Sequence, residues 1–256
     1  MTDAIELAPE LRCRGRAKFV SEPVSSSLFA GAAPRRLKAD EALFVAGQSG
    51  DGCYRLERGL LKVVITSPGG EERILAMLGP GAIVGELAML DEWPRSASVF
   101  AVRECELSFI SRREFEERTI RHPEIYQYLV NVLATRLRQA NEVMAASCFM
   151  TIQARLARVL LELGKYVGED DGAGHVVIGH KISQSDLAAM AGVARENVSR
   201  VMSDWKRNNV VTRSSGLYCL IDIATLKRNM DSQDERRRTT GDTNRFTNGL
   251  VGVSPR

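Results

Sequence analysis

The chain of 256 residues holds 35 Lys and Arg against 32 Asp and Glu, a formal net charge of +3. Charged residues make up 26% and hydrophobic residues 44%, proportions that argue against a wholly disordered chain and against a membrane protein. No run approaches the roughly 18 apolar residues of a membrane span, and charges in the first twenty residues exclude the apolar core of a secretion signal.

The cysteines are odd in number, widely spaced and without a Cys-x-x-Cys pair: Cys13, Cys53, Cys105, Cys148 and Cys219. This pattern argues against a disulfide framework or a zinc site and is typical of a protein of the reducing cytoplasm. No metal-ligand spacing links the three histidines, His122, His175 and His180. We therefore expect no metal, and the sequence shows no nucleophile–base arrangement that would indicate an enzyme.

Residues 1–27 mix charges with prolines, which predicts a loosely ordered extension. Residues 28–118 then show short β-rich runs separated by glycines. Short strands at intervals of about 8–12 residues predict a small antiparallel barrel or sandwich. The runs are 42–45, 53–56, 60–65, 73–78, 97–102 and 107–110, with Pro68-Gly69-Gly70 as a turn.

One segment of this region, residues 81–97, is suited to a small anion. Its middle, 86–92, is compatible with a single helical turn. Helix N-terminal amides, a buried arginine (Arg95) and a hydroxyl (Ser96) can hold a phosphate, and Glu86 can accept from a ribose hydroxyl. From these residues alone, an ion pair between Arg95 and Glu86 without a ligand is equally consistent.

Residues 119–149 predict a long helix. Apolar and small residues recur in it at alternating spacings of three and four, the pattern of a coiled-coil seam. We expect this seam to join two copies of the chain, the alternative being a helix that lies on its own barrel. The seam consists of Val130, Leu133, Leu137, Ala140 and Met144, flanked by polar Arg136 and Asn141.

Residues 150–230 predict a helix-turn-helix followed by a β-hairpin wing. The first helix, at 183–191, starts with a capping box formed by Ser183 and Asp186, and Gly192 is suited to the tight turn before the second helix at 194–208. Residues 231–256 are polar and predict a disordered tail.

The second helix presents residues that suit the edges of DNA bases. Arg195, Glu196 and Arg200 project from its N-terminal part, which enters the major groove in helix-turn-helix proteins. Arginine pairs with guanine and glutamate with cytosine. An exposed ion pair between Glu196 and Arg200 is the structural alternative.

The charge distribution agrees with a polyanionic partner for this region alone. Residues 30–110 hold 9 Lys and Arg against 11 Asp and Glu, whereas residues 151–230 hold 11 against 8. A local excess of positive charge favours a nucleic acid, although a solvated helix face would produce the same balance.

The cassette Gly85-Glu86…Pro94-Arg95-Ser96-Ala97, the long helix and the helix-turn-helix together resemble the cAMP receptor protein/fumarate–nitrate regulator (Crp/Fnr) superfamily of bacterial transcription factors. The resemblance covers about residues 28–228 and is closest to the cAMP-receptor type. It implies an α+β fold with a cyclic-nucleotide-binding β-roll at 28–118, a dimerisation helix at 119–149 and a winged helix-turn-helix at 150–230. The N-terminal cysteine cluster of the iron–sulfur members is missing, so we expect no iron–sulfur cluster.

The resemblance also implies roles for individual residues. Glu86 would meet the ribose 2′-hydroxyl of cAMP, or alternatively cGMP, and Arg95 its phosphate. The full ligand set would be Gly85, Glu86, Arg95, Ser96, Arg136, Ala140 and Asn141. A TGTGA-type half-site in palindromic double-stranded DNA would be contacted by Ser183, Arg195, Glu196 and Arg200. The implied protein is a homodimeric transcription regulator with RNA polymerase as a partner.

Two positions depart from the cAMP receptor. Ala140 stands where that family member has a threonine that touches adenine, and Ala194 stands where a serine or threonine would cap the recognition helix. An alternative hypothesis therefore keeps DNA binding without a ligand. Glu86 and Arg95 would then form a structural pair, or oxidation of Cys148 would provide the control.

Overall fold

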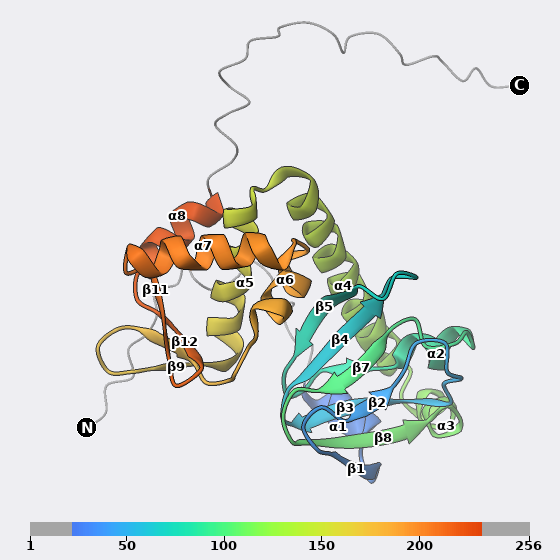
Figure 1. The fold of residues 1–256 in the computed structure, drawn as a ribbon. Coiled ribbons are helices and arrows are strands. Elements are labelled where there is room, and N and C mark those ends of the chain that lie inside the picture. The colour runs from blue at the N-terminus through green and yellow to red at the C-terminus, as the bar shows by residue number, and fades with distance from the viewer. Residues whose placement is uncertain (1–21, 232–256) are drawn as a thin grey trace, which may run out of the picture.

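The computed structural model describes residues 22–231, which form a β-roll, a long helix and a helix-turn-helix domain (Figure 1). Residues 1–21, with Cys13, and residues 232–256 lie outside the described part, and so do most of the predicted extension and tail. Within the described residues no helix is long and apolar enough to cross a membrane. The predicted α+β class is confirmed.

Two antiparallel four-stranded sheets make up the roll. The predicted strands are all present, and the sequence missed the Arg-rich edge strand β1 and the two-residue β6. One sheet has the order β1 (Ala33–Leu37), β8 (Cys105–Ser111), β3 (Gly52–Arg58), β6 (Ile83–Val84); the other has β2 (Ala42–Phe44), β7 (Ser98–Ala101), β4 (Leu61–Thr66), β5 (Glu72–Leu78). The turn at residues 67–70 joins β4 to β5, as predicted.

A close contact between backbone and side chain fixes the end of β3. Gly59 has a φ of +112°, a conformation that residues with a Cβ rarely adopt. A Cβ there would lie 2.4 Å from the Sγ of Cys105 and 2.7 Å from the carbonyl oxygen of Glu104. Cys105 belongs to a buried apolar cluster of the roll with Leu56 and Leu107.

The helices on either side of the roll differ from the prediction. Residues 22–27, predicted as loosely ordered, belong to helix α1 (Glu22–Leu28), because Leu28 is fully buried in a cluster that α4 shares. The long helix α4 covers Glu124–Phe149 and does not extend back to residue 119. Pro123, which fixes φ and has no N–H to donate, separates it from α3 (Arg112–Arg121), a helix the sequence did not predict.

The C-terminal domain contains the predicted helix-turn-helix and wing. Helix α5 (Ile152–Val167) lies beneath α6 (Gln184–Ala191) and α7 (Arg195–Arg207) in a common apolar core. The wing strands pair with a further hairpin, which the predicted helix-turn-helix and wing did not include. Helix α8 was not predicted either. The sheet order is β11 (Val211–Ser214), β12 (Leu217–Leu220), β10 (Val176–Ile178), β9 (Gly168–Asp170), and α8 (Ile223–Asp231) follows.

The substitution Gly59→Ala should destabilise the roll. The added methyl requires a positive φ and meets Cys105, so we expect the free energy of unfolding to fall by about 2–4 kcal/mol. Calorimetric unfolding measures the change. Gly69→Ala is the matched control, because its Cβ would meet no atom closer than 3.7 Å and its φ is not positive. Equal unfolding temperatures for the two variants would contradict the strain at Gly59.

Candidate ligand pocket and nucleic-acid interface

A small pocket of about 60 Å³ lies in the roll, where β6, the short helix α2 (Glu86–Asp91) and the segment before β7 meet. The predicted helical turn at 86–92 is therefore confirmed. The wall combines apolar side chains with five of the predicted ligand residues, one of which, Arg136, belongs to α4. Its lining includes Phe44, Val84, Gly85, Glu86, Arg95, Ser96 and Arg136.

Arg95 is the buried cation of this pocket, with only 5% of its surface exposed. Its Nη1 donates to the carbonyl of Gly85 at 2.6 Å and its Nη2 to the carbonyl of Gly52 at 2.9 Å, while Nε has no partner. The guanidinium lies 4.4 Å from the centre of the Phe44 ring. Burial lowers the pKa of Arg95, but an arginine stays charged at neutral pH.

Two glycines make room for this guanidinium. A Cβ at Gly50 would lie 2.6 Å from the Cζ of Arg95, and a Cβ at Gly85 would lie 2.3 Å from its Nη1. Gly85 also has a φ of +81° where it precedes α2. Side chains larger than hydrogen at these positions would push the arginine out of place.

Glu86 is 1% exposed and pairs with Arg136 of α4. Arg136 donates both to Oε1 of Glu86 and to the carbonyl of Ile83. Oε2 of Glu86 is buried and has no hydrogen-bond partner. The alternative of a structural Glu86–Arg95 pair is therefore wrong: no ion pair joins these two side chains, because the backbone carbonyls hold Arg95 and Arg136 takes the carboxylate.

The structure brings together five of the seven predicted ligand residues and leaves two apart. Ser96 is exposed at the mouth of the pocket. Ala140 and Asn141 are exposed on α4, about one helical turn beyond Arg136, and do not line the pocket. The family resemblance implies that Arg136, Ala140 and Asn141 face the purine of the ligand across the dimer, whereas in this structure Arg136 pairs with Glu86.

The helix-turn-helix has the local geometry that its sequence predicts. The Ser183 hydroxyl accepts from the backbone N–H of Asp186 at 3.0 Å, and Oδ2 of Asp186 accepts from the N–H of Ser183 at 2.9 Å. Gly192 ends α6 with a φ of 61°. Ala194 precedes α7 and provides no side-chain cap, as its methyl side chain requires.

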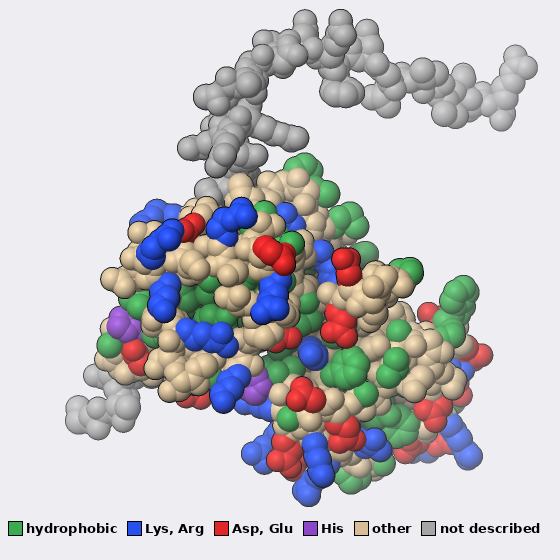
Figure 2. Space-filling view, viewed as in Figure 1, with side chains coloured by type: hydrophobic (Ala, Val, Ile, Leu, Met, Phe, Trp, Pro, Cys, Tyr) green, Lys and Arg blue, Asp and Glu red, His purple; other side chains and the backbone are tan. Residues whose placement is uncertain are grey.

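Helix α7 separates a buried face from an exposed one. Val198, Val201, Met202 and Trp205 lie in the core of the domain. Arg195, Glu196 and Arg200 are exposed, and no ion pair joins Glu196 to Arg200, so the structural alternative for these residues is wrong. In Figure 2, Lys and Arg side chains predominate over this domain, whereas both signs mix on the roll.

The roll and the helix-turn-helix domain are in direct contact. Met77 of β5 packs against the core of the C-terminal domain, and Arg73 donates to the Ser147 hydroxyl of α4 at 3.0 Å. The Arg73 guanidinium lies so close to Gly192 that a Cβ there would approach it to 1.9 Å. The turn between α6 and α7 therefore depends on the position of β5.

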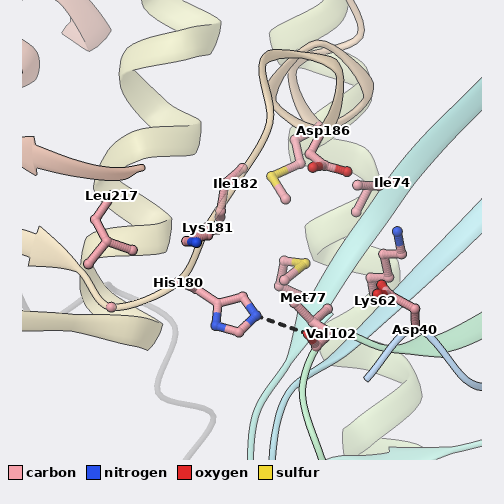
Figure 3. A pocket seen from close by; sticks show the side chains of 12 residues that line it. Asp40, Lys62, Ile74, Met77, Val102, His180, Lys181, Ile182, Asp186 and Leu217 are labelled. Atoms are coloured by element: carbon pink, nitrogen blue, oxygen red, sulfur yellow. Dashed lines mark hydrogen bonds between the residues drawn. The ribbon is translucent and has the colours of Figure 1, made fainter. Parts of the chain in front are cut away.

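Beside this contact lies a cleft of about 480 Å³ (Figure 3). Ile74, Met77 and Lys62 of the roll face Ile182 and Asp186 of the other domain across it. His180 bridges the two domains, because its Nε2 forms a hydrogen bond of 2.9 Å with the carbonyl of Val102. Any change in the angle between the domains must break or shift these contacts.

The described cysteines differ in exposure. Cys53 and Cys105 are buried, and burial raises the pKa of each thiol, with Glu86 adding to the effect at Cys53. Such thiols stay protonated and unreactive at neutral pH. Cys148, the predicted redox candidate, is exposed near the end of α4.

Two family models match the chain. A cyclic nucleotide-binding domain matches residues 34–122, and a Crp-like helix-turn-helix domain matches residues 154–229. The first range contains the pocket around Arg95, and the second contains α6, α7 and the wing. The two domains thus match separately, each at the site described above.

Similar proteins agree with both matches. The cyclic AMP receptor protein of Thermus thermophilus is 34% identical over 214 residues, which cover 79% of this chain and 95% of that protein. The CRP-like cAMP-activated global transcriptional regulator of Mycobacterium tuberculosis is 31% identical over 186 residues, 73% of this chain and 83% of that protein.

Among solved structures, the c-di-GMP-responsive global regulator CLP of Xanthomonas campestris has the same fold. It superposes with a TM-score of 0.67 at 20% identity, covering 78% of this chain and 99% of that one. The chain belongs to the Crp/Fnr superfamily and is a Crp-like DNA-binding transcription regulator with a cyclic nucleotide-binding domain.

Proposed function

We propose that this regulator is a homodimer gated by a cyclic nucleotide, with cAMP favoured over cGMP, and that it reads a TGTGA-type palindrome. RNA polymerase is the partner expected for such a regulator. The relatives from Thermus thermophilus and Mycobacterium tuberculosis that are named for cyclic AMP support the choice of nucleotide. The observation that carries the proposal is the buried guanidinium of Arg95, which has no carboxylate partner.

A buried cation without a carboxylate in contact is costly, because burial removes it from water and no direct ion pair replaces the water. Two carbonyls occupy two of the five N–H donors of Arg95, and its Nε is free. A phosphate supplies both the missing negative charge and acceptor oxygens. The unpartnered Oε2 of Glu86 similarly suits a donor such as the ribose 2′-hydroxyl.

The pocket in this structure is too small for a nucleotide. Its volume of about 60 Å³ is far below the 300–1,000 Å³ of ordinary ligand sites. Arg136 holds Glu86 and the carbonyl of Ile83, so a nucleotide that reaches Glu86 must move Arg136 or take over its hydrogen bonds. Because Arg136 belongs to α4, binding in the roll would then shift the helix that connects the two domains.

The exposed apolar residues of α4 support dimerisation along this helix. Val130, Leu137 and Met144 have exposed fractions of 56%, 64% and 65%, at intervals of seven residues. Such a stripe on a long helix is costly in water and is covered when two helices pair. Ala140 adds a small side chain in the same seam, and Leu133 is half-buried. The α4 helices of two copies would thus lie together beside both pockets.

Nucleotide gating can be tested by fluorescence anisotropy with a labelled TGTGA-N6-TCACA duplex at one fixed salt concentration, since phosphate contacts make affinity depend steeply on salt. We expect cAMP to tighten binding by about 5–150-fold, the usual range of allosteric coupling. Arg95→Met should remove this effect because the phosphate loses its cation.

The matched control is Arg58→Met, which removes an exposed arginine from the same roll and should leave the cAMP effect intact. A circular dichroism melt shows that each variant is folded. Tight binding to the duplex that changes with neither cAMP nor cGMP would contradict gating. The protein would then be a ligand-independent regulator, and oxidation of Cys148 would be its remaining means of control.

Half-site reading can be tested with the same duplex and a scrambled one. Arg200→Ala should cost about 1–3 kcal/mol on the TGTGA palindrome and much less on the scrambled duplex, because a base contact is lost. Lys206→Ala, an exposed change on the same helix, should weaken both duplexes alike. Equal losses for Arg200→Ala on both duplexes would assign Arg200 to the phosphates instead.

The dimer can be tested by sedimentation velocity. Leu137→Asp places a charge in the centre of the α4 seam and should convert the dimer into a monomer at micromolar concentration. Ile120→Asp is the control, because Ile120 is 82% exposed on α3 and outside the seam. If the dimer persists in Leu137→Asp and dissociates in Ile120→Asp, the interface lies on α3 and not on α4.

A further inference from the structure

Three side chains of metal-ligand type converge on the sheet of the C-terminal domain, apart from the nucleotide pocket and from the exposed face of α7. They are Asp171, His175 and Cys219, and one ligand atom from each lies within 4.8 Å of the other two. Sequence analysis missed this group, because Cys219 is 44 positions from His175 and no spacing motif links them.

The strand register explains why they meet. Cys219 of β12 lies opposite Val177 of β10, and His175 precedes Val177 by two residues, so these two side chains belong to the same face of the sheet. Asp171 directly follows Asp170, the partner of Val176, and therefore lies beside His175. The residues between them, Val176 and Tyr218, pack toward the core on the other face. The three candidate ligands therefore lie on the outer face, where an ion from solvent reaches them.

Hydrogen bonds already orient two of the three groups. Nδ1 of His175 lies 2.8 Å from Oδ2 of Asp171, and Oδ1 of Asp171 accepts from the N–H of Ala173 and of His175. This contact places the imidazole and the carboxylate side by side, so a metal ion can replace the proton between Nδ1 and Oδ2 and bind both groups. The thiol of Cys219 is free and half-buried.

We propose that Asp171, His175 and Cys219 bind a Zn²⁺ ion. A thiolate with an imidazole and a carboxylate favours Zn²⁺ over Mg²⁺ or Ca²⁺, which prefer oxygen ligands alone. Binding converts the Cys219 thiol into a thiolate and releases its proton to water. Water fills the fourth tetrahedral position.

Tetrahedral bonds of about 2.0–2.3 Å place ligand atoms roughly 3.5 Å from one another. The ligand atoms of this group already lie within 4.8 Å of one another, so a small movement of the side chains completes the site. The segment that carries Asp171 and His175 permits this movement, because Gly172 and Gly174 lie in it with φ values of +80° and +84° and its side chains face solvent. The ion would then tie the β9–β10 hairpin to β12, the second strand of the wing.

The test uses the full chain, freed of metal by dialysis against a chelator, and Co²⁺ as a visible substitute for Zn²⁺. We expect one equivalent of Co²⁺ to give tetrahedral d–d bands and a thiolate-to-cobalt charge-transfer band, both removed by one equivalent of Zn²⁺. Cys219→Ser should abolish the charge-transfer band. Asp171→Asn should weaken Zn²⁺ binding by about tenfold or more, because a neutral amide replaces a carboxylate ligand.

Cys148→Ser is the matched control, because it removes an exposed free cysteine outside the group and should leave the spectrum unchanged. His175→Asn provides a second variant if Cys219→Ser proves unstable, and it should lose the tetrahedral bands. The proposal is overturned by the lack of stoichiometric Co²⁺ binding, or by a charge-transfer band that survives Cys219→Ser. A band lost in Cys148→Ser would equally overturn it, since it would place the ion elsewhere.

Discussion

The guanidinium of Arg95 is the constraint around which the pocket of the roll is built. Gly50 and Gly85 lack the Cβ that would displace it, and Phe44 covers one of its faces. All of this holds a positive charge inside the protein without a carboxylate against it. The burial of this charge costs free energy, and an anion bound to Arg95 would offset that cost. The same burial that lowers the stability of the domain would therefore provide affinity for a phosphate.

Helix α4 connects the pocket of the roll with the DNA-binding domain. Arg136 links this helix to Glu86 in the pocket, and Ser147, near its other end, accepts from Arg73 of β5. Arg73 also packs on Gly192, in the turn before α7. Burial and the nearby Arg73 lower the pKa of Arg155, which donates to the Gly192 carbonyl, so two cations lie close together at this junction. Arg73 contacts both Ser147 of α4 and the turn before α7, so a shift of α4 would change the contact between the two domains.

Features that depend on a few neighbouring residues were predicted correctly from the sequence. The strands, the capping box at Ser183 and the helical turn after Gly85 follow from alternation, capping and turn chemistry within a few residues. Prediction from the sequence failed for the elements that contacts between distant residues stabilise. The exposed, Arg-rich β1 has no hydrophobic pattern and forms because β8 offers an edge, and α1 is stabilised by the burial of Leu28. The alternative without a ligand paired Glu86 with the nearby Arg95, whereas its partner in this structure is Arg136, fifty residues away.

The positions of Ala140 and Asn141, which the family resemblance assigns to the base, would link ligand binding to assembly under the proposed function. Within one subunit the pocket offers groups for a phosphate and a ribose, whereas Ala140 and Asn141 lie exposed on α4 outside it. If the seam on α4 joins two copies, these residues lie beside the interface and reach a base only in the dimer. A nucleotide held by both subunits then strengthens dimerisation by the same factor by which dimerisation strengthens nucleotide binding, because coupling free energies are reciprocal. Under the proposed function, the choice between adenine and guanine would be a property of the dimer, and an isolated subunit should bind both nucleotides weakly and with little discrimination.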